Sequence, residues 1–313
     1  MPNTPFLRIG TRGSALALWQ AEHVRDLVCR VHGVGRDDIH IEIIRTTGDR
    51  ITDRPLSEAG GKGLFTKEIE EALICGAVDI AVHSAKDMPT ELPDGLELSA
   101  FLEREDVRDA YLSPVAERLV DLPRGAVVGS ASLRRQAQIQ RRRPDIKVIN
   151  FRGNVGTRLD KLANGDVDAT MLAFAGMKRL GIADQVTELL SEDEFLPALG
   201  QGCVCVESRI GDERTAGLMA GIDDEAARAE LLTERAFLRM LDGSCRTPIA
   251  GLARFARGKI SFRGLVLQHD GSAVVETELA GKAEDAEAIG TVAGEKVLQE
   301  AGEDFMAAVR AHG

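Results

Sequence analysis

The chain opens on Leu7-Arg8-Ile9-Gly10-Thr11-Arg12-Gly13-Ser14, which is followed by a helical pattern from Ala15 through Val28. A short apolar run, a turn rich in Gly and Ser and an amphipathic run predict a strand, a tight turn and a helix. The same order recurs at Val127-Val128-Gly129-Ser130-Ala131-Ser132, before the helical pattern of Leu133–Arg142. The recurrence indicates that two parts of the chain share one strand–turn–helix design.

A second pair of matching segments supports a duplication. Gly76-Ala77-Val78-Asp79-Ile80-Ala81 corresponds to Gly165-Asp166-Val167-Asp168-Ala169-Thr170, and each follows a predicted helix, at Lys67–Ile74 and Thr157–Ala163. A helix, a glycine and a strand in succession are common in α/β proteins, so coincidence is the alternative. Agreement at two places favours two related domains. The first copy is longer around residues 46–63, which are rich in Gly, Asp, Thr and Ser and predict a mobile lid.

Alternating strands and helices predict an α/β fold class, with two similar doubly wound domains around a cleft. Residues 223–313 follow a different pattern, which predicts a small C-terminal α+β domain with an antiparallel sheet. The predicted elements of this last part are Glu225–Leu241, Ile249–Phe255, Lys259–Leu267, Ala273–Leu279 and a helix from Ala283.

The composition argues against several classes of protein. The chain has 313 residues, and 39 Lys and Arg against 50 Asp and Glu give a net charge of −11, which disfavours nucleic-acid binding through bulk charge. No apolar run reaches the roughly 18 residues of a membrane span, and the first residues lack the pattern of a secretory signal. The five cysteines are odd in number and lack disulfide-framework spacing, so we expect a cytoplasmic protein.

Positive charge gathers in the turns where the cleft is expected. Arginine can hold a carboxylate or phosphate with two parallel N–H donors, and helix N-termini add partial positive charge. For Arg141, Arg142 and Arg143 we prefer the alternative, a solvated helix face. The arginines in turns predict a ligand with several anionic groups; they are Arg12, Arg134, Arg135, Arg152 and Arg158.

Carboxylates suit these arginines better than phosphates do. Gly60-Gly61-Lys62-Gly63 lacks the earlier glycine and the Ser or Thr after Lys of a P-loop, and no spaced glycine triplet suits a dinucleotide. We expect no metal, because Cys203-x-Cys205 has no second pair of ligands at metal-binding spacing.

Two polar loops carry side chains of the kinds that act in catalysis. His83-Ser84-Ala85-Lys86-Asp87-Met88-Pro89 follows the predicted strand Val78–Val82, at the end of a strand where α/β sites form. A serine hydrolase is one interpretation, without the usual Gly-x-Ser-x-Gly, and a loop that caps its own backbone is another. In Asp242-Gly243-Ser244-Cys245-Arg246-Thr247-Pro248, Arg246 favours the thiolate of Cys245, although most single cysteines are inert.

Five motifs, present together and in order, closely resemble the porphobilinogen deaminase (hydroxymethylbilane synthase) family. They are Gly60-Gly61-Lys62-Gly63-Leu64-Phe65, His83-Ser84-x-Lys86-Asp87-x-Pro89, Ser132-Leu133-Arg134-Arg135-Gln136, Arg152-Gly153-Asn154-Val155-Gly156-Thr157-Arg158 and Gly243-Ser244-Cys245. The resemblance covers nearly the whole chain and implies two domains like those of periplasmic binding proteins, plus a third. It implies domain 1 at residues 1–104 and 200–222, an inserted domain 2 at 105–199 and domain 3 at 223–313.

The resemblance also implies a cofactor and a reaction. Family members carry a dipyrromethane cofactor, held by a thioether to the loop cysteine, here Cys245. They add four porphobilinogen molecules head to tail with loss of ammonia and release hydroxymethylbilane. The growing chain carries acetates and propionates, which suits the arginines in turns. Further carboxylate contacts are expected from Lys62, Lys86, Ser84 and Ser132.

The remaining roles also follow from the resemblance. Asp87 is the expected catalytic carboxylate, as a stabiliser of positive charge at the pyrrole nitrogens and with proton donation left open. Phe65 is expected to pack on a pyrrole ring, and Gln201 to lie near the interdomain hinge. We expect a monomer that passes its product to uroporphyrinogen-III synthase.

A non-catalytic binding protein for organic anions is the main alternative. It explains the duplicated domains and the arginines equally well, but it needs neither Cys245 nor Asp87 nor a third domain. A DNA- or RNA-binding protein would use residues 134–143, and the acidic net charge and 4% aromatic content disfavour it.

Overall fold

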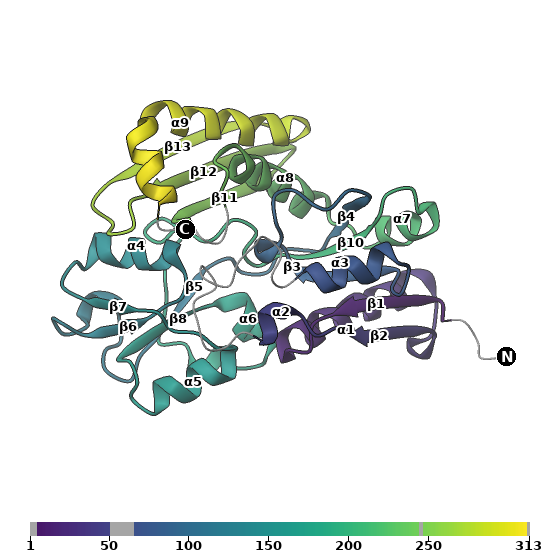
Figure 1. The fold of residues 1–313 in the computed structure, drawn as a ribbon, viewed down its shortest axis with the longest axis horizontal. Coiled ribbons are helices and arrows are strands. Elements are labelled where there is room, and N and C mark those ends of the chain that lie inside the picture. Colours follow the sequence, from purple (N-terminus) through teal and green to yellow (C-terminus); the bar gives the residue numbers. More distant parts are fainter. Residues whose placement is uncertain (1–4, 51–65, 244–246, 312–313) are drawn as a thin grey trace. The chain divides into compact units, whose positions relative to one another are not determined.

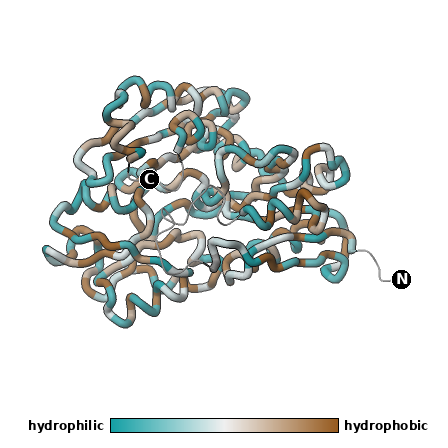
Figure 2. The backbone as a smooth tube through the Cα atoms, viewed as in Figure 1, coloured by the Kyte–Doolittle hydropathy of each residue, from teal (hydrophilic) through white to brown (hydrophobic). Residues whose placement is uncertain are grey.

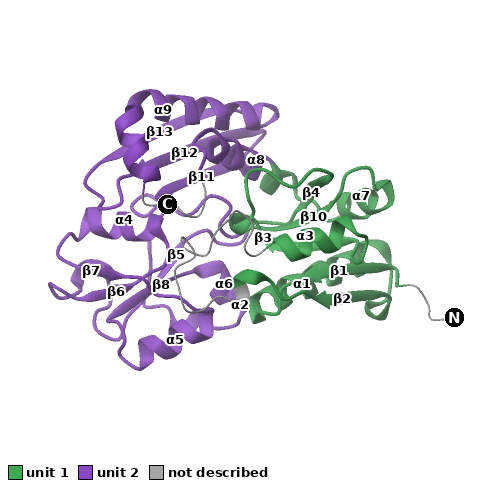
Figure 3. Ribbon diagram, in the orientation of Figure 1, with its two compact units in different colours: residues 1–104, 203–228 green, residues 105–202, 229–313 purple. Residues whose placement is uncertain are grey.

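The computed structural model describes residues 5–50, 66–243 and 247–311. The chain forms two compact units, one of residues 1–104 and 203–228 and one of residues 105–202 and 229–313 (Figure 3). The first unit contains one sheet and the second contains two (Figure 1).

The sheet of the first unit has five strands in the order β2-β1-β3-β10-β4. The strands β1, β2 and β3 run parallel, whereas β10 is antiparallel to both β3 and β4. The chain therefore leaves this unit after β4 and returns to place β10 between two strands made earlier. The strands are β1 (Leu7–Thr11), β2 (Ile39–Ile43), β3 (Ile80–Ser84), β4 (Leu96–Phe101) and β10 (Val204–Arg209).

Helices cover both faces of this sheet. Ala21 and Val24 of α1 and Met219 of α7 join one apolar core, and Ile69 and Leu73 of α3 join the core on the other face. The helix α1 begins at Ser14, whose side chain accepts a hydrogen bond from the backbone of the first turn. The helices are α1 (Ala15–His32), α2 (Thr47–Arg50), α3 (Lys67–Ile74) and α7 (Glu213–Ala220).

The first sheet of the second unit repeats this design. Its order is β7-β6-β8-β5-β9, with β6, β7 and β8 parallel and β5 antiparallel to both of its neighbours. In both sheets the three parallel strands have the same arrangement and the fourth strand is antiparallel to both neighbours, which confirms the predicted pair of similar α/β domains. The antiparallel strand comes last in the chain in the first sheet and first in the second. The strands are β5 (Asp109–Leu112), β6 (Val127–Gly129), β7 (Lys147–Ile149), β8 (Ala169–Ala173) and β9 (Glu188–Leu189).

This sheet also has helices on both faces, as predicted for a doubly wound domain. Ile139 of α4 belongs to one core, and Leu162 of α5 and Met177 of α6 belong to the core on the opposite side. Hydrophobic residues run along the strands between these helices (Figure 2). The helices are α4 (Leu133–Arg142), α5 (Val155–Ala163) and α6 (Phe174–Arg179).

The third sheet is antiparallel, as predicted, with the order β11-β12-β13. Two helices pack on it through a single apolar core that includes Phe237 and Val297. They approach closely at Gly290, where an added Cβ would lie 2.1 Å from the Thr233 carbonyl oxygen. The elements are α8 (Glu225–Met240), β11 (Ile249–Ala256), β12 (Lys259–Leu267), β13 (Val274–Lys282) and α9 (Ala286–Arg310).

The division into two units does not test the three predicted domain boundaries. The second and third sheets belong to one unit and share a core that includes Ala137 of α4 and Leu265 of β12. The predicted three-domain division therefore stays a prediction.

No described helix is both long and apolar enough to cross a membrane. Short 3-10 turns complete the fold at Arg36–Asp38, Ala85–Asp87, Leu119–Asp121, Ala183–Gln185 and Ala283–Asp285.

Candidate active site

In the first unit, the predicted site residues lie at the carboxyl ends of two adjacent strands. Arg12 directly follows β1, and Ser84, Lys86 and Asp87 lie at the end of β3. The two strands are parallel neighbours, with Ile9 opposite Ile80, so both groups lie at the same edge of the sheet. Asp87 is exposed, whereas Arg12, Ser84 and Lys86 are half-buried. This edge is where α/β proteins place ligands.

Hydrogen bonds anchor the turn that carries Asp87. The backbone N–H of Ala85 donates to the Cys203 carbonyl over 3.0 Å, and that of Met88 donates to the Ala85 carbonyl over 3.3 Å. The buried Gln20 donates from Nε2 to Ser84 Oγ over 2.9 Å. Because a hydroxyl both accepts and donates, Ser84 keeps an O–H for a ligand oxygen.

In the second unit, the predicted residues follow β6 and β7, which are also parallel neighbours. Ser132 is the N-cap of α4 and accepts a hydrogen bond from Arg135 N over 3.4 Å. Arg152 lies in the loop between β7 and α5, and Arg158 lies in the first turn of α5. Each unit therefore carries its basic residues at the carboxyl ends of its parallel strands, beside helix N-termini that favour anions.

The loop from Arg152 to Arg158 is closely packed on itself. Asn154 caps α5 by accepting hydrogen bonds from Thr157 N over 2.9 Å and Thr157 Oγ1 over 3.0 Å. Arg158 Nε donates to the Gly153 carbonyl over 2.9 Å. Gly153 has φ of +133°, and an added Cβ would lie 2.8 Å from Thr157 Cβ. This position therefore requires glycine for both backbone and steric reasons.

We expect the substitution Gly153→Ala to lower the unfolding temperature of the second unit by about 2–8 °C, because an incompatible φ costs roughly 1–2 kcal/mol. Gly156→Ala is the matched control in the same loop, since a Cβ there meets only Asn154 Oδ1 at 3.5 Å. Differential scanning calorimetry of both variants tests this expectation. Equal unfolding temperatures for the two variants would contradict it.

Arg134, Arg135 and Gln201 converge on one carboxylate, that of Asp109. Arg134 Nη1 donates to Asp109 Oδ2 over 2.7 Å, and Arg135 Nη2 donates to Asp109 Oδ1 over 2.7 Å. Gln201 Nε2 donates to the same Oδ1 over 2.8 Å. All four side chains are buried, and Asp109 and Gln201 are fully enclosed. The structure thus adds Asp109 as a shared internal partner of three predicted site residues.

The charges in this cluster do not cancel. Burial raises the pKa of Asp109, but the charges and hydrogen bonds of Arg134 and Arg135 lower this pKa more, so it lies well below its ordinary value. One ionised carboxylate therefore faces two guanidinium groups. Arg134 Nε is a buried donor with no acceptor in the described part of the chain, and burial lowers the pKa of this arginine. Such a cluster favours a further anionic group.

Asp109 is not among the site residues predicted from the sequence. Its one visible signal is an acidic residue at the first position of a four-residue apolar strand, Asp109–Leu112, which is buried throughout. A carboxylate at such a position requires a cationic partner.

Comparison with known proteins decides the family. The family model described as porphobilinogen deaminase, dipyromethane cofactor binding domain, matches residues 7–217. The model described as porphobilinogen deaminase, C-terminal domain, matches residues 229–299. The chain belongs to the porphobilinogen deaminase family.

Close relatives carry the same family name. Two proteins named porphobilinogen deaminase, from Nitrobacter hamburgensis and Nitrobacter winogradskyi, are 56% and 54% identical to this chain over 297 residues. Each match covers 95% of this chain and 94% of the relative. The solved structure of the methionine binding protein MetQ matches 69% of this chain and 87% of its own at 12% identity, with a TM-score of 0.43, too low for any argument. The resemblance stated from the motifs is thus confirmed.

Three predicted site residues of this porphobilinogen deaminase family member lie outside the described residues. They are Lys62 and Phe65 of the predicted lid and Cys245 of the predicted cofactor loop. Among the residues that are described, no three His, Cys, Asp or Glu side chains form a group that could hold a metal ion.

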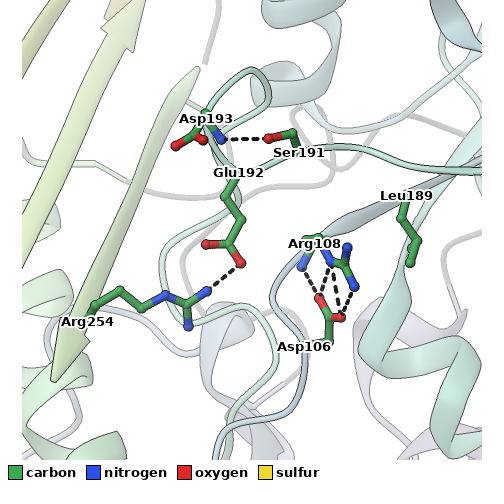
Figure 4. A pocket seen from close by; sticks show the side chains of 7 residues that line it. All are labelled: Asp106, Arg108, Leu189, Ser191, Glu192, Asp193 and Arg254. Atoms are coloured by element: carbon green, nitrogen blue, oxygen red, sulfur yellow. Dashed lines mark hydrogen bonds and ion pairs between the residues drawn. The ribbon is translucent and has the colours of Figure 1, made fainter. Parts of the chain in front are cut away.

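A surface hollow of about 550 Å³ in the second unit contains none of the residues expected for porphobilinogen deaminase chemistry (Figure 4). Its two arginines are already paired: Arg108 Nη2 donates to Asp106 Oδ2 over 2.6 Å, and Arg254 pairs with Glu192. Neutralised cations give a dianion little attraction. The predicted site is therefore the better candidate for a polycarboxylate ligand. The hollow is lined by Asp106, Arg108, Leu189, Ser191, Glu192, Asp193 and Arg254.

Proposed function

We propose that this chain catalyses the head-to-tail condensation of four porphobilinogen molecules, with loss of four ammonia molecules, and releases hydroxymethylbilane by hydrolysis with one water molecule. The observation that carries the proposal is the cofactor-binding-domain match over residues 7–217. That range contains Asp87 and the basic residues at the carboxyl ends of β1, β3, β6 and β7. Although the net charge of the chain is negative, its basic residues thus lie where a polycarboxylate ligand would bind.

The residues of the second unit fit a dipyrromethane cofactor. Its two pyrrole rings carry acetate and propionate groups, and the cluster around Asp109 has one positive charge more than it has negative charges. The buried Arg134 Nε supplies a donor without an acceptor in the described chain, and Ser132 is the N-cap of the same helix, α4. We propose that Cys245 holds the cofactor through a thioether. When bound, the cofactor supplies a free pyrrole α-carbon as the nucleophile.

The proposed tasks of the other polar residues are binding and orientation. Arg12, Arg152 and Arg158 would hold substrate or cofactor carboxylates with two-donor geometry. Ser84 and Lys86 would add single donors beside the reacting carbon. Lys62 and Phe65 would cover the bound rings, and Gln201 would join Asp109 to the segment that returns to the first unit.

Asp87 is the residue that we propose as catalytic. Loss of ammonia leaves the substrate as a cation delocalised over the pyrrole ring, and an exposed carboxylate at the end of β3 can approach the pyrrole N–H. At ~4 Å and an effective dielectric constant near 20, one ion pair contributes roughly 4 kcal/mol. If Asp87 makes that interaction only as positive charge develops on the substrate, it raises the rate of ammonia loss about a thousandfold.

The proposed setting is the cytoplasm, where the chain works as a monomer and passes its product to uroporphyrinogen-III synthase. Cys29 and Cys75 are free thiols, which supports a reducing compartment. A linear product with a reactive hydroxymethyl end suits rapid transfer to an enzyme that closes the ring.

Intact-mass spectrometry of the purified protein beside Cys245→Ser tests the proposed function. We expect the wild type to be heavier by two linked pyrrole units and the variant to have the mass of its chain alone. An unmodified wild type is then incubated with porphobilinogen, and its mass and ammonia release are followed. Gain of mass with ammonia release supports the proposal. Neither change, together with reversible binding of organic carboxylates, would replace it with an anion-binding protein.

A further inference from the structure

His83 belongs to a buried polar cluster for which the proposed mechanism gives no role. It directly precedes Ser84, and only 6% of its surface is exposed. In the antiparallel ladder of β3 and β10, Cys205 lies opposite His83, and Glu207 lies opposite Ala81. Side chains two residues apart on a strand share a face, so Glu207 and His83 point to the same side of the sheet. His83 Nε2 lies 3.2 Å from Glu207 Oε2.

A second carboxyl group approaches the same face from α3. Ile69 and Leu73 of this helix pack against Ala81, and Glu70, which is 7% exposed, lies on the same side of the helix. Burial raises the pKa of Glu70; the Thr66 hydroxyl opposes this, and the charge of Glu207 adds to it.

The cluster is costly to the fold. His83 Nε2, Glu70 Oε1 and both carboxylate oxygens of Glu207 make no hydrogen bond to the rest of the described chain. The contact between His83 and Glu207 has the distance of an ion pair without the angles of a hydrogen bond. Each unsatisfied buried polar group costs about 1–3 kcal/mol. A cluster with that cost, one residue from the proposed catalytic turn, requires an explanation beyond packing.

We propose that Glu207 is a positioning residue for the condensation reaction: it holds His83, and through His83 it holds the carboxyl end of β3 and the turn that carries Asp87. The inference rests on the proposed function and extends it to β10. Asp87 itself is exposed, so its position is set by the strand and turn below it.

Residues 203–207 contact this part of the chain at two points. Glu207 of β10 faces His83 of β3, and the carbonyl of Cys203, which directly precedes β10, accepts the hydrogen bond from Ala85 N of the turn. These contacts lie on either side of Ser84, so residues 203–207 restrain both ends of the residue that precedes the 3-10 turn. A displacement of ~1 Å at a reacting group can lower the rate about 100-fold, so a restraint of this kind has a measurable effect on catalysis.

The test compares Glu207→Gln, His83→Gln and the double variant with the wild-type holoenzyme. The matched control is Asp79→Asn, at the opposite end of the same strand, where Asp79 Oδ1 accepts a hydrogen bond from Arg8 Nη2 over 2.6 Å. Intact mass verifies the bound cofactor in each variant. Ammonia release from porphobilinogen then gives kcat and KM, well below the unfolding temperature of each protein.

We expect kcat of Glu207→Gln to fall about 10- to 100-fold, with KM within about twofold of wild type. His83→Gln should show the same loss, and the double variant should lose no more than either single one, because the two residues act as a unit. Asp79→Asn should keep its kcat within about twofold. If Glu207→Gln does not fold, His83→Gln decides by the same criteria.

Three results would overturn the inference: unchanged kcat in a folded Glu207→Gln or His83→Gln, an equal loss in Asp79→Asn, or multiplying losses in the double variant. A wild-type protein that releases no ammonia refutes the proposed function instead. The two failures are therefore distinguishable.

Discussion

The variant Asp87→Ala is expected to lose nearly all turnover, about a thousandfold or more in kcat, and to keep its fold. The loss follows because the roughly 4 kcal/mol of a carboxylate–cation interaction is gained as ammonia leaves and charge develops on the substrate. The fold should survive because Asp87 is exposed at the end of a 3-10 turn that its neighbours anchor. Single-turnover ammonia release and circular dichroism measure the two halves of this expectation.

The matched control for Asp87→Ala is Glu91→Ala, which removes another exposed carboxylate from the same loop. This control should retain near-normal kcat, because its charge has no proposed partner in the reaction. Near-normal turnover in Asp87→Ala itself would remove Asp87 from the mechanism. If both variants lost kcat equally, the effect would come from the net negative charge of the loop and not from Asp87 in particular.

The variant Asp109→Ala is expected to destabilise the second unit by about 3–5 kcal/mol, because it leaves two buried guanidinium groups without their counter-ion. At about 2–4 °C per kcal/mol, the unfolding temperature should fall by roughly 6–20 °C. The control is Asp145→Ala, which removes a partly exposed partner of Arg143 and should cost about 1 kcal/mol or less. Differential scanning calorimetry compares the two, and similar stability for both would refute the role of Asp109.

The stability that Asp109 contributes should also depend on pH in the acid range. The folded-state pKa of Asp109 is depressed, so its contribution to stability is fully present above its unfolded pKa of about 3.9 and is lost as the pH falls through the lower folded value. The difference in unfolding temperature between the wild type and Asp109→Asn should therefore be constant from about pH 6 to 8 and shrink only below about pH 4. A difference that shrinks near neutral pH would contradict this assignment.

The local elements could be predicted because their signals lie within a few residues of each other. The predicted helices Lys67–Ile74 and Leu133–Arg142 have the bounds seen in the structure. The strand β3 was displaced, since Ile80–Ser84 was predicted as Val78–Val82. There, Val78 precedes the strand but packs in the same core as Ala81, so the apolar pattern does not mark the start of the strand.

The long-range clusters could not be predicted from local pattern. The Gln201 side chain meets Asp109 across 92 positions, and Arg135 meets it across 26. Arg134 and Arg135 were predicted to bind carboxylates of a ligand, and no local pattern showed that both are buried against a carboxylate from another strand. The cluster of Glu70, His83 and Glu207 escaped for the same reason, because three elements contribute to it.

The position of β10 has a consequence for protein synthesis. This strand fills the gap between β3 and β4, yet Leu102, which follows β4, and Cys203, which precedes β10, are in contact across 101 positions of the chain. At about 5–20 residues per second, a ribosome needs roughly 5–20 s to make the intervening residues. During that interval the emerging N-terminal segment has two strands with unpaired edges, which can pair with other nascent chains. We therefore expect the nascent chain to depend most on a chaperone in the interval before β10 is made.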